Sequence, residues 1–252
     1  MLLSSLAFYD QRHTQGVNVK IGIFGIEGYT SGKEDIVDKR IDVLKQMFNS
    51  GKKVFIQAEI LAAEEKLIEA DVIACPETGK LDLIIKDMEF VETRLERSQS
   101  GEEKVLLNRL KEQLEKEKFL SELTLTDAER KLLEGATLLT IKPVLLASQA
   151  QLDDKKTLLF DAYYRSGYIS FFTAGDKDAH AWSIKSGMNA YEASGAIHSD
   201  IQRGFIRAEV VSYKDLVADG SLSKAKAANH VRLEMKDYVV QDGDYLVIRT
   251  NK

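Results

Sequence analysis

A glycine-rich segment after the first apolar run carries the residue types of a phosphate-binding loop. Gly25, Gly28 and Gly32 precede Lys33 and Glu34. In a working loop of the form G-x-x-x-x-G-K-[ST], backbone N–H groups bind phosphates, the lysine neutralises them and a hydroxyl holds Mg²⁺. Gly25 lies two positions too far from Gly32 for this pattern, and Gly28 lies one position too near. The segment therefore has the composition of a nucleotide site without its spacing.

Glu34 stands where the metal-binding hydroxyl belongs. A carboxylate at the start of the helix expected there repels phosphate at the helix end that would otherwise attract it. We therefore expect a turn that only joins a strand to a helix, and no bound cofactor. The alternative is ATP or GTP with Mg²⁺, held by Gly25, Gly28, Gly32, Lys33 and Glu34.

The elements around this segment predict a small parallel sheet. Val37, Ile41, Leu44 and Phe48 have helical spacing, and apolar residues alternate from Val54 to Ile60 as in a strand. The expected order is strand 17–24, helix 37–48, strand 54–60, helix 61–70 and strand 71–75. Strands that alternate with helices in this way are typical of an α/β fold.

Two amphipathic segments follow and predict an antiparallel helical hairpin. Their apolar seams consist of Ile84, Met88, Val91 and Leu95, and then of Leu107, Leu110 and Leu114. A polar break at 98–101 separates them, and we expect the seams to close the hairpin against itself. Thr126 and Glu129 form a capping box that begins another helix.

The chain then returns to the sheet and ends in a β-rich module. We expect a buried strand at 141–148 and a helix at 158–166. Short strands are expected at 181–184, 205–211, 238–240 and 245–249, with a hairpin signal at 241–244. Phe171, Phe172 and Trp182 are expected to pack in the core of this module.

Composition excludes several classes of protein. The chain has 252 residues, a net charge of −5 and one cysteine, Cys75, so a reducing, cytoplasmic compartment is expected. No apolar run is long enough to span a membrane, and the four histidines lack zinc-like spacing. Residues 1–16 have neither the basic start nor the cleavage site of a signal peptide, and we expect an N-terminal extension.

Ordered motifs in the last third carry a family resemblance. They comprise 171–175 (FFTAG), 181–182 (AW), 197–200 (IHSD), 204–210 (GFIRAEV) and 236–244 (KDYVVQDGD). This region resembles the TGS domain of the Obg-like ATPase (YchF) family, which implies a β-grasp, ubiquitin-like fold. Upstream, 81–95 resembles the start of the family's coiled-coil insertion, and 138–143 resembles the strand that re-enters its nucleotide domain.

The resemblance gives a domain plan for the whole chain. Residues 17–80 and 135–167 would form a shortened, degenerate P-loop-like domain, into which a helical hairpin is inserted at 81–134. Residues 168–252 would form the TGS domain.

The departures from the family concern its hydrolytic motifs. Where the family has Asp-x-x-Gly for metal and γ-phosphate, the chain has Gln57-Ala58-Glu59-Ile60. Where the family has Asn-x-x-Glu for the base, the chain has Gln149-Ala150-Gln151-Leu152, and Leu152 accepts no hydrogen bond from a purine. We therefore do not expect the family's hydrolase activity here.

The basic residues of the last third are the candidates for a partner surface. From Tyr168 on, 11 Lys/Arg balance 11 Asp/Glu, so only segregation of charge creates a basic patch. The candidates are Arg203, Arg207, Lys224, Lys226, Arg232 and Lys236. The resemblance implies contact with the ribosome or nucleic acid, and ordinary solvated charges are the alternative. The predicted function is a non-catalytic protein that binds RNA, the ribosome or a translation-associated partner; the alternative is a divergent ATP/GTP hydrolase.

Overall fold

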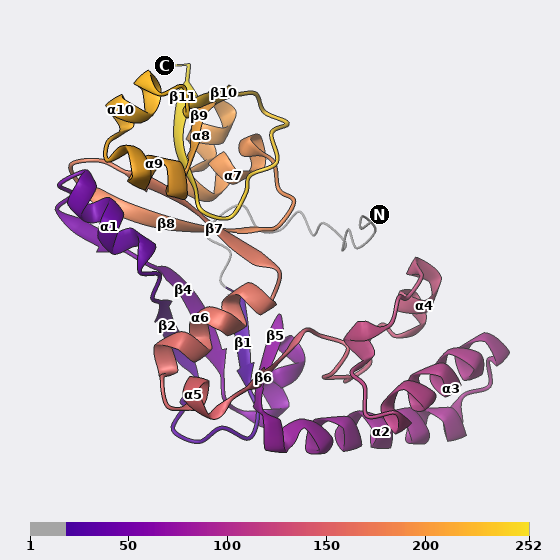
Figure 1. Ribbon diagram of the computed structural model, residues 1–252. Coiled ribbons are helices and arrows are strands. Elements are labelled where there is room, and N and C mark those ends of the chain that lie inside the picture. Colours follow the sequence, from indigo (N-terminus) through magenta and orange to yellow (C-terminus); the bar gives the residue numbers. More distant parts are fainter. Residues whose placement is uncertain (1–18, 252) are drawn as a thin grey trace. The chain divides into compact units, whose positions relative to one another are not determined.

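The computed structural model describes residues 19–251 and divides them into two compact units (Figure 1). The first, called the parallel-sheet unit, comprises Val19–Ile36 and Gln57–Ser166; the second, called the C-terminal unit, comprises Val37–Ile56 and the residues from Gly167 onward. Both combine helices and strands, as predicted. Residues 37–56, assigned from the sequence to the first domain, group with the last third of the chain. The expected extension at 1–16 lies outside the described residues.

The sheet of the parallel-sheet unit has the order β2-β4-β1-β5-β6. Its strands are β1 (Val19–Ile23), β2 (Gly32–Ile36), β4 (Ile56–Leu61), β5 (Val72–Pro76) and β6 (Val144–Ala147). Strand β1 is parallel to β4 and β5, and β5 is parallel to β6. Helix α5 (Gln149–Leu152) follows β6, and helix α6 (Lys155–Arg165) packs against β1, β2, β5 and β6. The expected parallel pairing is therefore confirmed for four strands.

One local expectation is wrong, and one is confirmed with different bounds. The residues from Gly32 to Ile36 form strand β2 instead of the start of a helix, and the helix begins later, as α1 (Arg40–Met47). The strand expected at 54–60 is confirmed as β4, except that Val54 ends a separate strand, β3 (Lys52–Val54), of the other sheet. Phe55 lies between the two strands, and the chain passes from one unit to the other between Ile56 and Gln57.

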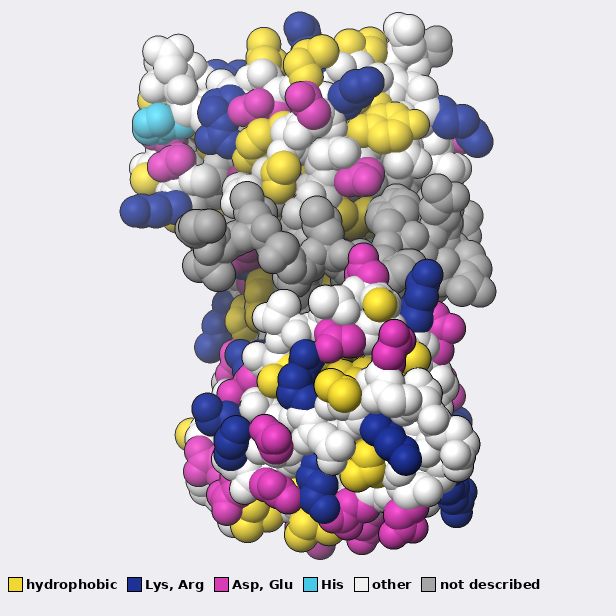
Figure 2. All heavy atoms as spheres, turned by 90° about the vertical axis from the view of Figure 1, so that its right-hand side faces the viewer, with side chains coloured by type: hydrophobic (Ala, Val, Ile, Leu, Met, Phe, Trp, Pro, Cys, Tyr) yellow, Lys and Arg dark blue, Asp and Glu magenta, His cyan; other side chains and the backbone are white. Residues whose placement is uncertain are grey.

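The helical hairpin consists of α2 (Lys80–Arg97) and α3 (Gly101–Glu115), which pack against each other. Ile84, Val91, Leu107, Leu110 and Leu114 are buried in one apolar cluster, and Met88 and Leu95 pack against it. The cluster continues into the sheet through Ile73 and Cys75, so the hairpin and the sheet share a core. On the face that Figure 2 shows, Lys, Arg, Asp and Glu side chains are interspersed over the surface of this part.

The ends of these helices follow their sequence signals. The Ser100 hydroxyl accepts the Glu103 N–H at the start of α3. The predicted capping box is confirmed at α4 (Asp127–Leu132), where the Thr126 hydroxyl accepts the Glu129 N–H and the Glu129 carboxylate accepts the Thr126 N–H. The helix expected at 61–70 is the 3₁₀ helix η1 (Glu64–Glu69). No helix within residues 19–251 is long and apolar enough to cross a membrane.

The sheet of the C-terminal unit has the order β10-β9-β11-β7-β8-β3. Strands β7 (Tyr168–Ala174) and β8 (Asp178–Lys185) are antiparallel, as are β9 (Phe205–Ser212) and its neighbours β10 (Arg232–Glu234) and β11 (Asp244–Thr250). Strand β11 is parallel to β7, and β3 is parallel to β8. The strand expected at 238–240 is absent from the described sheet: Val239 forms only an isolated bridge with Asn189.

Helices cover both faces of this sheet. On one face, α7 (Ala190–Ile197) contributes Ala190 and Ala193 to a core with Phe171 and Leu246. On the other face, Phe172 contacts Tyr213 of α9 (Tyr213–Asp219), and Phe48 stacks on Tyr245. The unit also contains α8 (Ser199–Arg203) and α10 (Leu222–Ala227). Phe171 and Phe172 are fully buried, which confirms their expected role in packing.

Candidate functional site

A groove of about 600 Å³ lies at the carboxyl ends of three adjacent strands of the parallel-sheet unit. Phe24 and Gly25 follow β1, Ala62 follows β4, and Pro76 ends β5, and all four line the groove. This edge of a parallel sheet is where α/β proteins bind ligands, and the volume is within the range of small-molecule sites. The groove is therefore the candidate site of this unit.

The candidate phosphate loop contributes little to this groove. Of the five residues proposed for nucleotide binding, only Gly25 lines it; Gly28 and Gly32 are exposed, and Lys33 and Glu34 lie within β2. Because Gly32 begins a strand, this segment presents no helix N-terminus to a phosphate.

Side-chain contacts hold the loop and strand β2 in place. The Glu34 carboxylate is paired with Nζ of Lys155 on α6 at 2.6 Å, and the same ammonium lies 5.2 Å from the centre of the Tyr29 ring. The Ser31 hydroxyl accepts the N–H of Ala62. The carboxylate expected at a metal-ligand position therefore forms an ion pair with a lysine.

Acidic side chains dominate the charge of the groove. Glu64 of η1 and three residues on one face of α2, Asp82, Lys86 and Glu89, line it. Lys86 Nζ is hydrogen-bonded to the Glu64 carboxylate, which raises the pKa of Lys86. The four groups sum to −2, and such a surface repels a polyphosphate.

The two remaining family positions lie outside the groove. Residues 57–60 lie inside β4, where Ala58 and Ile60 are fully buried in the core. Residues 149–152 form the short helix α5, and Ser148 and Gln151 cap its start. None of these side chains lines the groove.

Cys75 is buried in the core and His198 caps a helix. Burial raises the pKa of the Cys75 thiol to about 12, so this cysteine is a poor nucleophile at neutral pH. The ring Nδ1 of His198 accepts the Asp200 N–H as the cap of α8. No group of three or more His, Cys, Asp and Glu side chains within residues 19–251 is arranged to hold a metal ion.

A second candidate site lies in the C-terminal unit, where basic side chains surround Glu209. The Glu209 carboxylate is paired with Lys226 of α10 at 2.7 Å and with Arg249 of β11 at 2.6 Å. These cations lower the pKa of Glu209, with Lys226 the larger influence. Arg207 is two positions from Glu209 on β9 and directly opposite Arg249, so it lies on the same side of the sheet. We call Arg207, Lys226 and Arg249 the basic sheet face.

The basic sheet face keeps two positive charges in excess of Glu209. Arg207 is exposed and forms no ion pair with the residues from 19 to 251. Arg249 was missed in the sequence because it lies more than 40 positions from Arg207 and only strand register brings the two together.

The other candidate cations are located elsewhere in the unit. Arg203 pairs with Asp200 on α8. Arg232 pairs with Glu234 and donates a hydrogen bond to the Tyr238 hydroxyl. Arg232 is opposite the buried Val210, and its side chain therefore leaves β10 on the α7 side of the sheet. Lys224 lies on α10, and Lys236 lies in the loop after β10.

The two sheets and their helices define a mixed α/β protein with the architecture of a YchF GTPase. The structure of the Schizosaccharomyces pombe YchF GTPase superposes with a TM-score of 0.70 at 17% identity, covering 92% of this chain and 98% of that one. A family model of the YchF C-terminal domain, described as a protein of unknown function (DUF933), matches residues 168–251.

Relatives that are similar in sequence carry YchF or Obg-like ATPase names. The ribosome-binding ATPase YchF of Bacillus subtilis is 34% identical over 248 residues, covering 73% of this chain and 68% of the relative. The chain therefore belongs to the YchF family of Obg-like ATPases. The match to the Haemophilus influenzae ribosome-binding ATPase YchF, at 37% identity, spans 47% of this chain and only 37% of that protein. The Obg-like ATPase 1 of Pongo abelii is 43% identical over 81 residues.

Proposed function

We propose that this chain is a non-hydrolytic member of the YchF family that binds the ribosome or its RNA through the C-terminal unit. The observation that carries the proposal is strand β2: Gly32, Lys33 and Glu34 belong to a strand, so they form no phosphate-binding turn at a helix N-terminus. The acidic groove at the sheet edge supports the same conclusion, because it opposes a nucleotide's negative charge.

The partner is proposed from the names of the relatives and from the basic sheet face. Several relatives are named ribosome-binding ATPases. Arg207 and Arg249 present guanidinium groups on one side of a sheet, and guanidinium groups bind phosphate in bidentate geometry. The strand order β9-β11-β7-β8, with α7 against one face, supports a TGS domain of β-grasp fold for this unit. The helical hairpin in turn supports the family's coiled-coil insertion.

Isothermal titration calorimetry with ATP and GTP in the presence of Mg²⁺ tests the first half of the proposal. We expect no heat of binding for either nucleotide. A Kd in the micromolar range would contradict it and favour the second candidate function, a divergent hydrolase, which the names of the relatives support. In that case Lys33→Ala should weaken nucleotide binding; in the proposed binder, Lys33→Ala leaves ribosome binding unchanged.

Co-sedimentation with ribosomes at low salt tests the second half. We expect the wild-type chain in the ribosome pellet and Arg207→Glu in the supernatant, because the substitution reverses a charge at the centre of the proposed contact. Arg203→Glu is the matched control, since Arg203 is an exposed arginine of the same unit outside the basic sheet face. An equal loss of ribosome binding in both variants would contradict a contact at the basic sheet face.

A further inference from the structure

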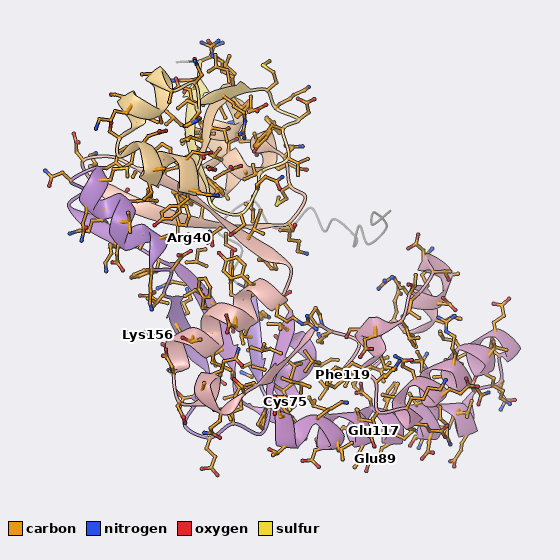
Figure 3. All side chains as sticks on the ribbon, in the orientation of Figure 1. Arg40, Cys75, Glu89, Glu117, Phe119 and Lys156 are labelled. Atoms are coloured by element: carbon orange, nitrogen blue, oxygen red, sulfur yellow. The ribbon has the colours of Figure 1, made fainter. Side chains whose placement is uncertain are left out.

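The groove of the parallel-sheet unit has two carboxylates that no side chain of the described residues pairs with directly. Asp82 and Glu89 line it and form no ion pair or hydrogen bond with any residue between 19 and 251. They are seven positions apart on α2, which places them two turns apart on one face of the helix. Figure 3 shows Glu89 on this helix and Cys75 on β5, the strand that leads into it.

Apolar surface lies between and beneath these carboxylates. Ile85, which is 53% exposed, lies between Asp82 and Glu89, and Leu81, 49% exposed, is one turn earlier on α2. Ile23, Phe24 and Pro76 at the strand ends also line the groove. An acidic helix face over an apolar floor is complementary to a segment that combines cationic and aliphatic side chains.

Lys86 shows how an ammonium group fits in this groove. Its Nζ is hydrogen-bonded to Glu64 and lies 5.9 Å from the centre of the Phe24 ring. A cation over an aromatic face is attracted by the ring quadrupole. The carboxylates of Glu89 and Asp82 further raise the pKa of Lys86, after the main contribution of its hydrogen bond to Glu64. The groove thus stabilises one ammonium of the chain itself and retains negative charge for a second.

We propose that this groove binds a basic, partly aliphatic segment of a protein partner, with a lysine or arginine side chain between Asp82 and Glu89 and an aliphatic side chain on Ile85. This goes beyond the proposed function, which assigns ribosome or RNA contact to the C-terminal unit. The same charges disfavour a nucleotide or a nucleic acid in the groove, and the apolar floor favours a peptide over a bare polyamine.

Fluorescence anisotropy of the full chain with a labelled hexapeptide of alternating lysine and leucine tests the proposal without ribosomes. We expect a Kd on the order of 10–100 µM. It should rise about tenfold when Asp82→Asn and Glu89→Gln are combined, because both carboxylates of the site are then neutral. Glu96→Gln is the matched control: Glu96 is an exposed acid on the same helix outside the groove, and its removal should change the Kd less than twofold.

A second readout locates the peptide. Cys75 is the only cysteine and is fully buried, so Ile85→Cys adds a single accessible thiol at the groove. The lysine–leucine peptide should slow alkylation of this thiol several-fold. It should not protect Val105→Cys on α3, where the replaced side chain is 72% exposed outside the groove.

Four results would overturn the proposal. They are equal binding of a glutamate–leucine hexapeptide, an unchanged Kd in the double variant, displacement of the peptide by an equal concentration of spermidine, and binding of ATP with Mg²⁺ at this groove. None of them depends on whether the chain binds ribosomes.

Discussion

The guanidinium group of Arg40 forms an ion pair with the carboxylate of Asp242, with Nη1 and Oδ2 2.7 Å apart. The same guanidinium binds Asp38, whose side chain is 3% exposed, and lies 5.0 Å from the centre of the Phe172 ring. Figure 3 labels Arg40 at the start of α1. Arg40 therefore connects residues 37–56 to the turn before β11, in addition to the pairing of β3 with β8 and the packing of α1 on β8.

Replacing Arg40 should destabilise the C-terminal unit more than replacing Asp242. Arg40→Ala leaves the Asp38 carboxylate buried without its cation, and we expect a loss of about 2–4 kcal/mol in the free energy of unfolding. Asp242 is 37% exposed, so Asp242→Asn should cost about 1 kcal/mol. Urea denaturation followed by circular dichroism measures both. Lys53→Ala, which removes an exposed pair with Asp42, is the control and should cost less than about 0.5 kcal/mol.

Asp87 should be the most sensitive polar position of the helical hairpin. Its carboxylate is 1% exposed and accepts hydrogen bonds from the N–H groups of Leu139 and Thr140 and from the Thr140 hydroxyl. In Asp87→Asn the new NH₂ group faces these donors, so we expect a loss of about 2–3 kcal/mol. Thermal unfolding of this variant should be compared with that of Asp127→Asn, an exposed acid of the same unit. Similar melting temperatures for both variants would contradict the buried role.

His180 should make the C-terminal unit sensitive to acid. Burial lowers the pKa of His180 from 6.5 to about 4, and its ring stacks on Trp182 with 3.5 Å between centroids. The unfolded chain therefore binds a proton between these pH values that the native state does not, so stability is present above pH 6.5 and is lost as the pH falls toward 4. The loss is on the order of 3 kcal/mol.

Trp182 is the only tryptophan and reports this transition directly. Urea titrations followed by its fluorescence should show that the free energy of unfolding of the wild type falls at acid pH. The decrease should be smaller in His180→Gln. His230 is a control whose contribution to stability should depend on pH in the opposite direction. A hydrogen bond to Asp219 raises the pKa of His230, so its contribution to the stability of the native state is lost as the pH rises. His230→Gln should lose as much stability at acid pH as the wild type does. A wild-type stability that does not change between pH 6.5 and 4 would contradict the role given to His180.

The slope of log K against log salt for ribosome binding should give the number of phosphate contacts that the basic sheet face makes. Each cation that neutralises a phosphate contributes about 0.7–0.9 to the slope of log K against log salt. Arg207→Ala and Arg249→Ala should each lower the slope by about that amount. Lys236→Ala, in the loop after β10, should leave it unchanged. Equal slopes for all three variants would place the contact outside this face.

The sequence predicted those elements whose side chains repeat with a clear period. The hairpin seam of Ile84 and Val91, the capping box at Thr126 and the short strand expected at 205–211 are all confirmed. These features are local, since each depends on side chains within a few turns or on one strand face. The family was also recognisable, because its motifs are ordered along the last third of the chain.

The failures arose where tertiary contacts decided the outcome. Gly32 and Lys33 have the residue types that end a phosphate loop and begin a helix, but pairing of β2 in the sheet determined their conformation. The apolar alternation from Val54 to Ile60 indicated one strand, but Val54 pairs with β8 of the other sheet, whereas the rest of the segment is β4 and pairs with β1. The pairing of Arg249 with Glu209 depends on the register of β11 against β9. The acidic lining of the groove depends on where η1 and α2 lie at the edge of the other sheet.

The assignment of residues 37–56 to the C-terminal unit has a consequence for synthesis on the ribosome. Strand β3 pairs with β8, whose first residue, Asp178, is made more than 120 residues after Lys52. At a synthesis rate of about 5–20 residues per second, roughly 6–25 s pass between the synthesis of β3 and that of the strand with which it pairs. During this time the apolar side chains of α1 and β3 are not covered by their sheet. The parallel-sheet unit completes its own segments during this interval, so nascent chains stalled before residue 167 should expose Ile41 and Leu44 to chaperones and proteases.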